Sequence, residues 1–231
     1  MTLSAKRKML SYLLKAVVVI AAVVGTAMSA YAGSQSFMGG SRVFMYFTIQ
    51  SNIAVALMSA VGAALMLRAR RIAGTWYVIK LVGTVAITLT GVVFCFVLAP
   101  TLGAEAWNVQ NVLTHVVVPV AAIADFFVTG VDSDIRKRSV IFVAIPPLLY
   151  AVYAGIGYGL KWEFAPGVYF PYFFLNWGSP AGAFGFSDRL PFMGCVWWIL
   201  ALLILLMLTG SLYLAILNRM KRHRVADKKI G

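Results

Sequence analysis

Six long runs of apolar residues divide the chain, and each is long enough to cross a bilayer. They fall at residues 10–32, 43–67, 77–99, 108–130, 139–160 and 191–217. A helix needs about 20 predominantly apolar residues to cross the hydrocarbon core of a membrane. The pattern therefore predicts an all-α, polytopic membrane protein with six transmembrane helices. These form a single transmembrane domain, and a basic tail follows at residues 218–231.

The composition supports this fold class. The chain is 61% hydrophobic and 12% charged, whereas soluble domains are about 45–50% apolar and about 25% charged. The first apolar run has a basic start and a small-residue end, as a signal peptide does. Its apolar part is about 20 residues long, however, which exceeds the 7–15 residues of the apolar region in a signal peptide. We therefore expect this run to be a helix of the mature protein.

Basic residues gather at every second boundary between the predicted spans. The clusters at residues 6–8, 68–71, 136–138 and 219–229 all fall on one side, and the other boundaries hold only Arg42, Lys161 and Arg189. By the positive-inside rule this asymmetry predicts that both termini are cytoplasmic. It also explains the net charge of +13 without nucleic acid, since no basic patch is interleaved with aromatic residues. Lys15, inside the first span, is expected to reach the basic end by snorkelling.

Two spans carry polar residues that are costly in hydrocarbon unless they face a partner or a cavity. Each set shares one helix face by the i, i+3, i+4 rule: Thr48, Ser51 and Asn52 in the second span, and Asn111, Thr114 and His115 in the fourth. At 1.5 Å per residue, Thr48 and His115 lie about 7.5 and about 10 Å from the outer ends of their spans. We predict that these two residues meet.

A hydroxyl beside an imidazole is the arrangement of nucleophilic catalysis. Threonine is a weak nucleophile until a base within about 3 Å takes its proton, and the amide of Asn52 or Asn111 could donate to an oxyanion. Pro119, four residues after His115, leaves the His115 carbonyl without its helical partner. The same side chains could instead form hydrogen bonds between helices, and the spacing alone favours this structural alternative.

The remaining ionisable residues complete the expectations for the site. Asp125 is about 15 Å from His115 along one helix, so we expect it to pair with residues 136–138 or to form a buried bond to another span. Glu105 is the expected acidic neighbour of His115. One histidine and scattered carboxylates form no metal-ligand set, so no metal and no cofactor is expected. Cys95 and Cys195 lie at matching depths in their spans, so they could form a disulfide. The favoured interpretation is that both are small apolar residues of the core.

Prolines and aromatic residues mark the rest of the predicted structure. Pro100 is expected to end the third span, and Pro146 with Pro147 predicts a kink within the fifth. The longest loop, residues 161–190, is rich in aromatic residues and has no net charge. Such a segment is expected at the level of the lipid headgroups.

Three segments carry a resemblance to a known family. They are residues 46–48 with Ser51 and Asn52, residues 113–115 with Val118, Pro119 and Asp125, and residues 169–175. In order and spacing these segments resemble the androgen-induced membrane hydrolases, which include the androgen-induced protein, the androgen-dependent TFPI-regulating protein and bacterial relatives. The resemblance implies a six-span enzyme that hydrolyses fatty acid esters of hydroxy fatty acids with an intramembrane threonine and histidine. These would be Thr48 and His115, and a bacterial relative would lie in the cytoplasmic (inner) membrane.

The sequence thus predicts an integral-membrane hydrolase that cleaves a lipid-like ester, with Thr48 as nucleophile and His115 as base. The partner would be a membrane lipid or fatty-acyl ester, and the sequence leaves the oligomeric state open. Five further residues are expected to contact the substrate: Ser51, Asn52, Asn111, Tyr172 and Phe173. The alternative is a non-catalytic six-helix protein, either a small-solute carrier or a structural bundle.

Overall fold

The structure, a computed structural model, describes residues 4–35, 40–68, 74–130 and 135–230. It is 82% helical and has no β-strand in these ranges. Six helical segments are long and apolar enough to cross a membrane, which confirms the predicted fold class. They are Ala5–Ser34, Phe47–Leu67, Gly74–Trp107, Val109–Gly130, Lys137–Gly159 and Cys195–His223.

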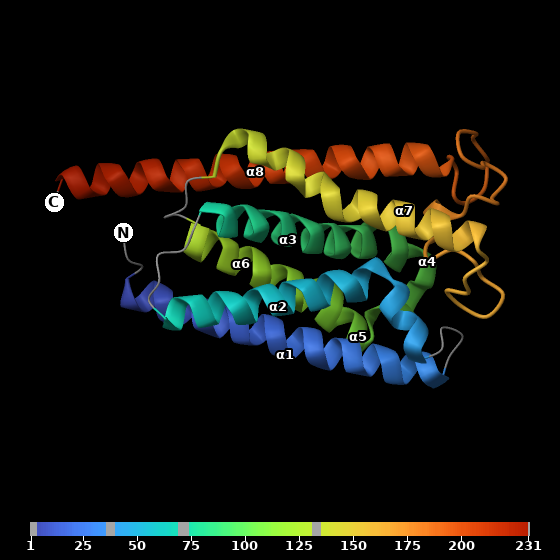
Figure 1. Ribbon diagram of the computed structural model, residues 1–231, viewed down its shortest axis with the longest axis horizontal. Coiled ribbons are helices and arrows are strands. Elements are labelled where there is room, and N and C mark those ends of the chain that lie inside the picture. The colour runs from blue at the N-terminus through green and yellow to red at the C-terminus, as the bar shows by residue number, and fades with distance from the viewer. Residues whose placement is uncertain (1–3, 36–39, 69–73, 131–134, 231) are drawn as a thin grey trace.

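Four helices form the main bundle. They are α1 (Ala5–Gln35), α2 (Phe47–Leu67), α3 (Gly74–Val93) and α6 (Val118–Gly130). Helix α1 packs on α2 and α6, and α3 also packs on α2 and α6. The beginning of α1 and the end of α8 lie at the same end of the bundle (Figure 1).

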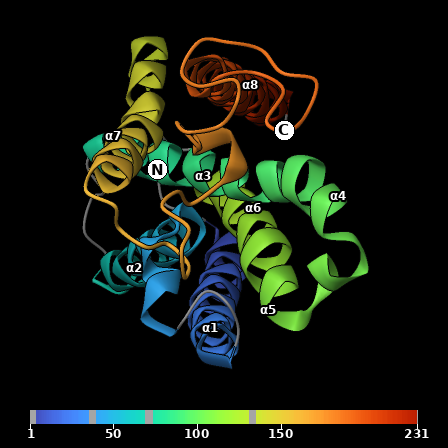
Figure 2. The same ribbon diagram turned by 90° about the vertical axis from the view of Figure 1, so that its right-hand side faces the viewer.

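Helices α7 (Ile145–Gly159) and α8 (Cys195–Ile230) lie on the α3 side of this bundle, away from α1 (Figures 1 and 2). They are the least covered spans, and their outward faces expose apolar side chains such as Leu149 and Leu208. The segment that joins them occupies the end of the bundle opposite the termini (Figure 1). In a bilayer these apolar faces can meet lipid chains without cost.

Two apolar clusters hold the helices together. One joins α3, α6, α7 and α8 around Leu81, Val85 and Phe126, all without exposed surface. The other joins α1, α2, α3 and α6 around Val18 and Ile87. Helix α1 therefore contributes to the protein core. Both cysteines are free: Cys195 is buried and Cys95 is half-buried, in line with the favoured interpretation of these residues.

Three predicted helix boundaries were wrong. Pro100 does not end the third span: it lies in the first turn of α4 (Ala99–Leu102), and the helical segment continues to Trp107. The π-helical turn η2 (Phe94–Leu98) precedes α4, and the 3₁₀ turn η3 (Gly103–Trp107) follows it. The sixth helix begins at Cys195 rather than at Pro191. Residues 43–45 are not α-helical but belong to the 3₁₀ turn η1 (Gly40–Met45).

The predicted proline kink takes another form. Pro146 and Pro147 do not interrupt a helix; they occupy the start of α7, where proline is well tolerated. The 3₁₀ helix η5 (Lys137–Ala144) leads into them. The fifth span is therefore a 3₁₀ helix joined to an α-helix, and the junction lies at the two prolines.

Candidate functional site

Thr48 lies in the first turn of α2. The helix begins at Phe47, and its N-cap residue, Tyr46, makes no capping bond with its side chain. The first N–H groups of a helix have no partner within it and carry a partial positive charge. The hydroxyl of Tyr172 accepts a hydrogen bond from the Thr48 N–H at 3.3 Å. The threonine hydroxyl therefore lies where a helix terminus favours negative charge.

His115 lies in a wide π-helical turn, η4 (Leu113–Val117), which follows α5 (Val109–Val112). Such turns occur often at functional sites, and this one fits the prediction that Pro119 loosens the helix here. Its Nδ1 is 3.0 Å from the Asn111 carbonyl oxygen, which can only accept. Nδ1 is therefore the protonated nitrogen, and Nε2 carries a free lone pair.

The neighbouring hydroxyl supports this tautomer. Thr114 donates its own proton to the Gln110 carbonyl at 2.8 Å. Its oxygen, 3.1 Å from Nδ1, is then an acceptor for the histidine N–H. Two acceptors thus bind Nδ1, and the lone pair of Nε2 remains available to the side chain that faces it.

Two glycines let neighbouring helices approach the histidine segment closely. A Cβ at Gly91 of α3 would lie 2.8 Å from the His115 carbonyl oxygen, and one at Gly25 of α1 would lie 2.7 Å from Cγ2 of Thr114. Phe94 stacks on the imidazole with 3.8 Å between ring centroids and 17° between planes. The histidine is buried and held on each side by packing.

The predicted pair meets. Thr48 Oγ1 lies 3.3 Å from His115 Nε2 and 3.4 Å from the Tyr172 hydroxyl oxygen. Both contacts are longer than an ordinary hydrogen bond between such atoms, and unliganded catalytic pairs are often this loose. Burial raises the pKa of Tyr172 above its ordinary value of 10.0, so this hydroxyl keeps its proton at neutral pH and can donate it in a hydrogen bond.

Ser51 and Asn52 connect helices. The Ser51 hydroxyl is 2.8 Å from that of Thr90 on α3, and Asn52 donates to the carbonyls of Thr48 and Thr114 at 2.8 and 3.1 Å. Both N–H bonds of the Asn52 amide are therefore used, and its remaining Oδ1 is an acceptor, which cannot stabilise an oxyanion. The geometry does not fit the oxyanion role expected for Asn52.

Asn111 and Glu105 do not have their expected roles either. The Asn111 side chain donates to the Ala106 carbonyl at 3.0 Å, so its amide is engaged in the adjoining turn. Glu105 is exposed, and the atoms that orient the imidazole are the Asn111 carbonyl and the Thr114 hydroxyl instead. The expected depth of Glu105 in the membrane does not determine in which direction its side chain points.

A narrow apolar pocket begins at Thr48. Thr48 and Tyr172 line it, and its empty space is about 620 Å³ with the open side included. His115, in η4, contacts Thr48 but does not line the pocket itself. The other lining residues come from α2, α3, η2, α7, α8 and the long loop: Phe47, Leu89, Thr90, Val93, Leu98, Pro147, Tyr150, Ala151, Phe174, Leu175, Ile199, Leu202 and Leu203. Nearly all are apolar.

The aromatic loop contributes Tyr172 to the site, as predicted, but not Phe173. Phe173 packs against Phe174 and Trp198 instead, and Phe174 takes the place at the pocket. The 3₁₀ turn η6 (Phe173–Leu175) sets this order. Phe164 is fully buried whereas Phe186 is exposed, so only part of the loop has the exposed aromatic surface expected at the headgroup level.

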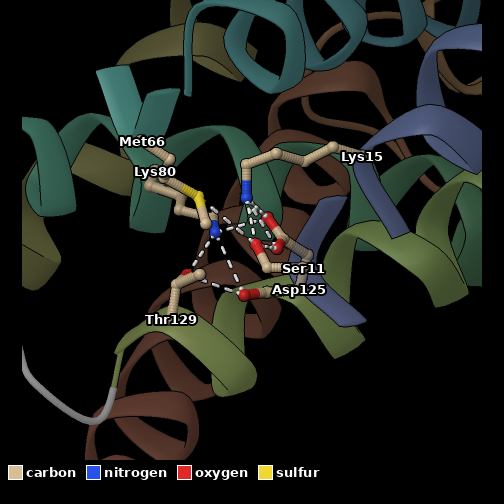
Figure 3. A network of polar contacts seen from close by, with 6 residues as sticks. All are labelled: Ser11, Lys15, Met66, Lys80, Asp125 and Thr129. Carbon is tan, nitrogen blue, oxygen red and sulfur yellow. Dashed lines mark hydrogen bonds and ion pairs between the residues drawn. The ribbon is translucent and has the colours of Figure 1, made fainter. Parts of the chain in front are cut away.

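A second polar cluster lies toward the other end of the bundle and holds three buried charges (Figure 3). Asp125 of α6 contacts the ammonium groups of Lys15 on α1 and Lys80 on α3 at 2.7 and 2.5 Å. Ser11 donates to the same carboxylate at 2.5 Å, and Lys80 also contacts the Thr129 hydroxyl. Lys15 does not snorkel, because its partner is inside the bundle. Of the two roles considered for Asp125, the buried bond to other spans is confirmed.

No group of three or more His, Cys, Asp or Glu side chains in the described ranges could hold a metal ion. Comparison of the chain with protein-family models, curated proteins and solved structures finds no match. The functional interpretation therefore depends on the residues themselves.

Proposed function

We propose that the protein is an integral-membrane hydrolase of the androgen-induced hydrolase type. It would cleave a fatty-acyl ester, such as a fatty acid ester of a hydroxy fatty acid. The observation that carries the proposal is the approach of Thr48 Oγ1 to the free lone pair of His115 Nε2, 3.3 Å away, at the start of an apolar pocket. A nucleophile, a base and a site for an acyl chain then lie together.

In the first step, Thr48 Oγ1 attacks the ester carbonyl carbon while His115 Nε2 takes the hydroxyl proton. The carbonyl oxygen becomes an oxyanion. Tyr172 supports this charge by donating its hydroxyl proton in a hydrogen bond, and the positive end of α2 adds to the stabilisation. The imidazolium then gives its proton to the alcohol oxygen as the C–O bond breaks, which leaves an acyl-threonine and the free alcohol.

In the second step, water attacks the acyl-threonine carbonyl and His115 takes a proton from it. The tetrahedral intermediate collapses, Thr48 regains its proton from the imidazolium, and a fatty acid leaves. The acyl chain would lie along the apolar pocket, between α3, α7 and α8, with its carbonyl at Thr48. Since α7 and α8 are the least covered spans, a lipid substrate could enter from the bilayer.

Labelling by a fluorophosphonate probe tests the proposal. The probe should modify the wild-type protein, and Thr48→Ala should abolish labelling because the nucleophile is gone. Thr209→Ala is the matched control, since the Thr209 hydroxyl also lies in a span but bonds only to its own helix. Labelling that survives in Thr48→Ala would exclude the nucleophile. A folded wild-type protein that is never labelled and never hydrolyses an ester would favour the non-catalytic bundle, in which Ser51 and Asn52 join helices.

The charge asymmetry supports a topology with both termini in the cytoplasm. Cysteine-free protein that carries Asp188→Cys, in the exposed loop, should react with an impermeant thiol reagent in intact cells. Arg136→Cys, exposed at the opposite end, should react only after lysis. The reverse pattern would place the termini outside.

A further inference from the structure

A basic pocket lies near the end of α8, between that helix and η5. Its lining holds four basic side chains, those of Lys137, Arg219, Arg222 and His223, together with Asn218 and Ala215. No carboxylate lines it, and no described carboxylate forms an ion pair with Lys137, Arg219 or Arg222. These charges play no part in the proposed hydrolysis. Helix α2 ends at Leu67 on the side of the termini, whereas Thr48 lies at the other end of this helix (Figure 1).

The pocket is built on a rigid junction. Val140 and Val143 of η5 lie against Gly210 of α8, where a Cβ would approach each of them to 3.3 Å. Leu217 packs onto Gly130 of α6 in the same way. The helices that carry the basic side chains therefore hold a fixed spacing, which a flexible tail would not provide.

The depth of the pocket corresponds to the headgroup region. Helix α8 has 36 residues and is about 54 Å long at 1.5 Å per residue, whereas the hydrocarbon core is about 30 Å thick. A span that begins near Cys195 therefore leaves the hydrocarbon close to Leu217. Arg219 and Arg222 follow directly and reach the level of lipid phosphates.

An apolar track continues from the pocket along the same face of α8. Steps of three and four residues lead from Arg219 through Ala215 to Leu212 and Leu208. Leu212 is 57% exposed and Leu208 is 64% exposed. A basic pocket at the membrane surface, followed by an exposed apolar track into the bilayer, matches the two parts of a phospholipid.

We propose that this pocket binds an anionic phospholipid, with the phosphate among Lys137, Arg219 and Arg222 and an acyl chain along Leu212 and Leu208. Arginine suits a phosphate because its guanidinium donates two parallel hydrogen bonds. Basic pockets at the cytoplasmic ends of spans are typical sites for such headgroups. The site is independent of the proposed catalytic pair.

Native mass spectrometry of the full chain in detergent tests the proposal, with phosphatidylglycerol as the probe. Wild-type protein should retain the lipid, and Lys137→Gln/Arg219→Gln/Arg222→Gln should bind it about a hundredfold more weakly, because three basic residues are lost and each one near the headgroup strengthens binding about fivefold. Arg219→Lys/Arg222→Lys keeps the charge and should restore part of the binding. The melting temperature without lipid shows whether each variant is folded, which these exposed positions should permit.

The matched control is Lys6→Gln/Lys8→Gln/Arg68→Gln, which removes the same charge from exposed positions outside the pocket. This variant should bind phosphatidylglycerol as the wild type does. Equal loss in both triple variants would show attraction to surface charge in general and overturn the site. Equal retention of phosphatidylcholine, or displacement of the lipid by inorganic phosphate at similar concentration, would overturn the anionic-lipid assignment.

Discussion

The two polar clusters inside the bundle differ in how completely their groups are satisfied. Around Asp125, each lysine ammonium has three oxygen acceptors, and all six contacts are within 3.0 Å. Around Thr48, the two contacts of the hydroxyl are 3.3 and 3.4 Å long, and an apolar pocket borders it. A cluster whose groups are fully bonded joins helices, whereas a cluster that is loosely bonded beside a cavity is available for a substrate.

The charges sharpen the contrast. The Asp125 cluster contains two ammonium groups and one carboxylate, so removal of the carboxylate leaves only positive charge in the bundle. The Thr48 cluster contains no carboxylate, and removal of one member leaves neutral groups. We therefore expect the first cluster to control stability and the second to control activity.

The largest expected effect is that of Asp125→Asn. The two buried lysines lose their counter-ion, and breaking a buried pair in this way costs about 3–5 kcal/mol. The variant should aggregate or melt far below the wild type in a thermal-stability assay in detergent. Asp188→Asn, in the exposed loop, is the control and should leave the melting temperature unchanged.

A compensating variant separates charge imbalance from loss of shape. Lys15→Met/Lys80→Met/Asp125→Leu removes all three charges, and such replacement is often neutral or stabilising. It should recover most of the melting temperature and retain ester hydrolysis. A stable, normally folded Asp125→Asn would contradict the structural role of the cluster.

The next effect concerns the Thr48–His115 pair. Thr48→Ala and His115→Ala should each lower the hydrolysis rate by about 10²-fold or more, because general base catalysis contributes about 10²–10⁴. The double variant should be no slower than the worse single variant, since residues that act as one unit are not additive. Thr48→Ser should retain part of the activity. Purified protein and a fatty-acyl ester, read by mass spectrometry for the released acid, provide the measurement.

Melting temperatures decide whether the pair is catalytic or structural. Thr48→Ala should melt close to the wild type, because the contacts of the Thr48 hydroxyl are 3.3 and 3.4 Å long. The two variants that carry His115→Ala also lose a buried ring that stacks on Phe94 and should melt somewhat lower. If the losses of rate multiply, or if activity falls only as stability falls, the pair packs the helices and does not act on an ester.

The sequence predicted the parts of this structure that periodicity and depth determine. Six apolar runs gave six spans, and the similar depths of Thr48 and His115 brought the two residues together. The sequence pattern does not predict in which direction a side chain points. Glu105 has a suitable depth but points to solvent, and Lys15 was expected to leave the core because its partner Asp125, 110 positions away, could not be identified from spacing.

Local geometry was also beyond the sequence pattern. Phe173 and Phe174 are adjacent, and only the 3₁₀ turn η6 decides which one faces the pocket. The hydroxyl of Tyr172 reaches Thr48 across 124 positions, and no periodicity relates them. One signal was present for the tautomer of His115: Asn111 is four residues earlier, a spacing at which a helical carbonyl can accept from the ring, as it does here.

A smaller effect is expected for Tyr172→Phe. It removes a hydroxyl that lies 3.4 Å from Thr48 Oγ1 in the unliganded site. Loss of a well-placed oxyanion donor costs about 10²–10³ in kcat, and we expect on the order of tenfold here because helix α2 still contributes. Tyr213→Phe is the control: its hydroxyl contacts that of Thr88 at 2.9 Å, and Tyr213 does not line the pocket. A fall in kcat for Tyr213→Phe alone would contradict the assignment of Tyr172.

The smallest expected effect tests the pocket. Ala151 of α7 lines the space that begins at Thr48, and Ala151→Leu adds three carbons to that space. The rate for a long-chain ester should fall about fivefold relative to a short-chain ester, because exclusion of one methylene from an apolar pocket costs about 1 kcal/mol at the low end of its range. The ratio kcat/KM for esters of increasing chain length provides the measurement. Ala201→Leu, on the exposed face of α8 and outside the pocket lining, should leave the chain-length profile unchanged. If both variants give the same profile, the acyl chain does not lie in this pocket, and the substrate must reach Thr48 by another route.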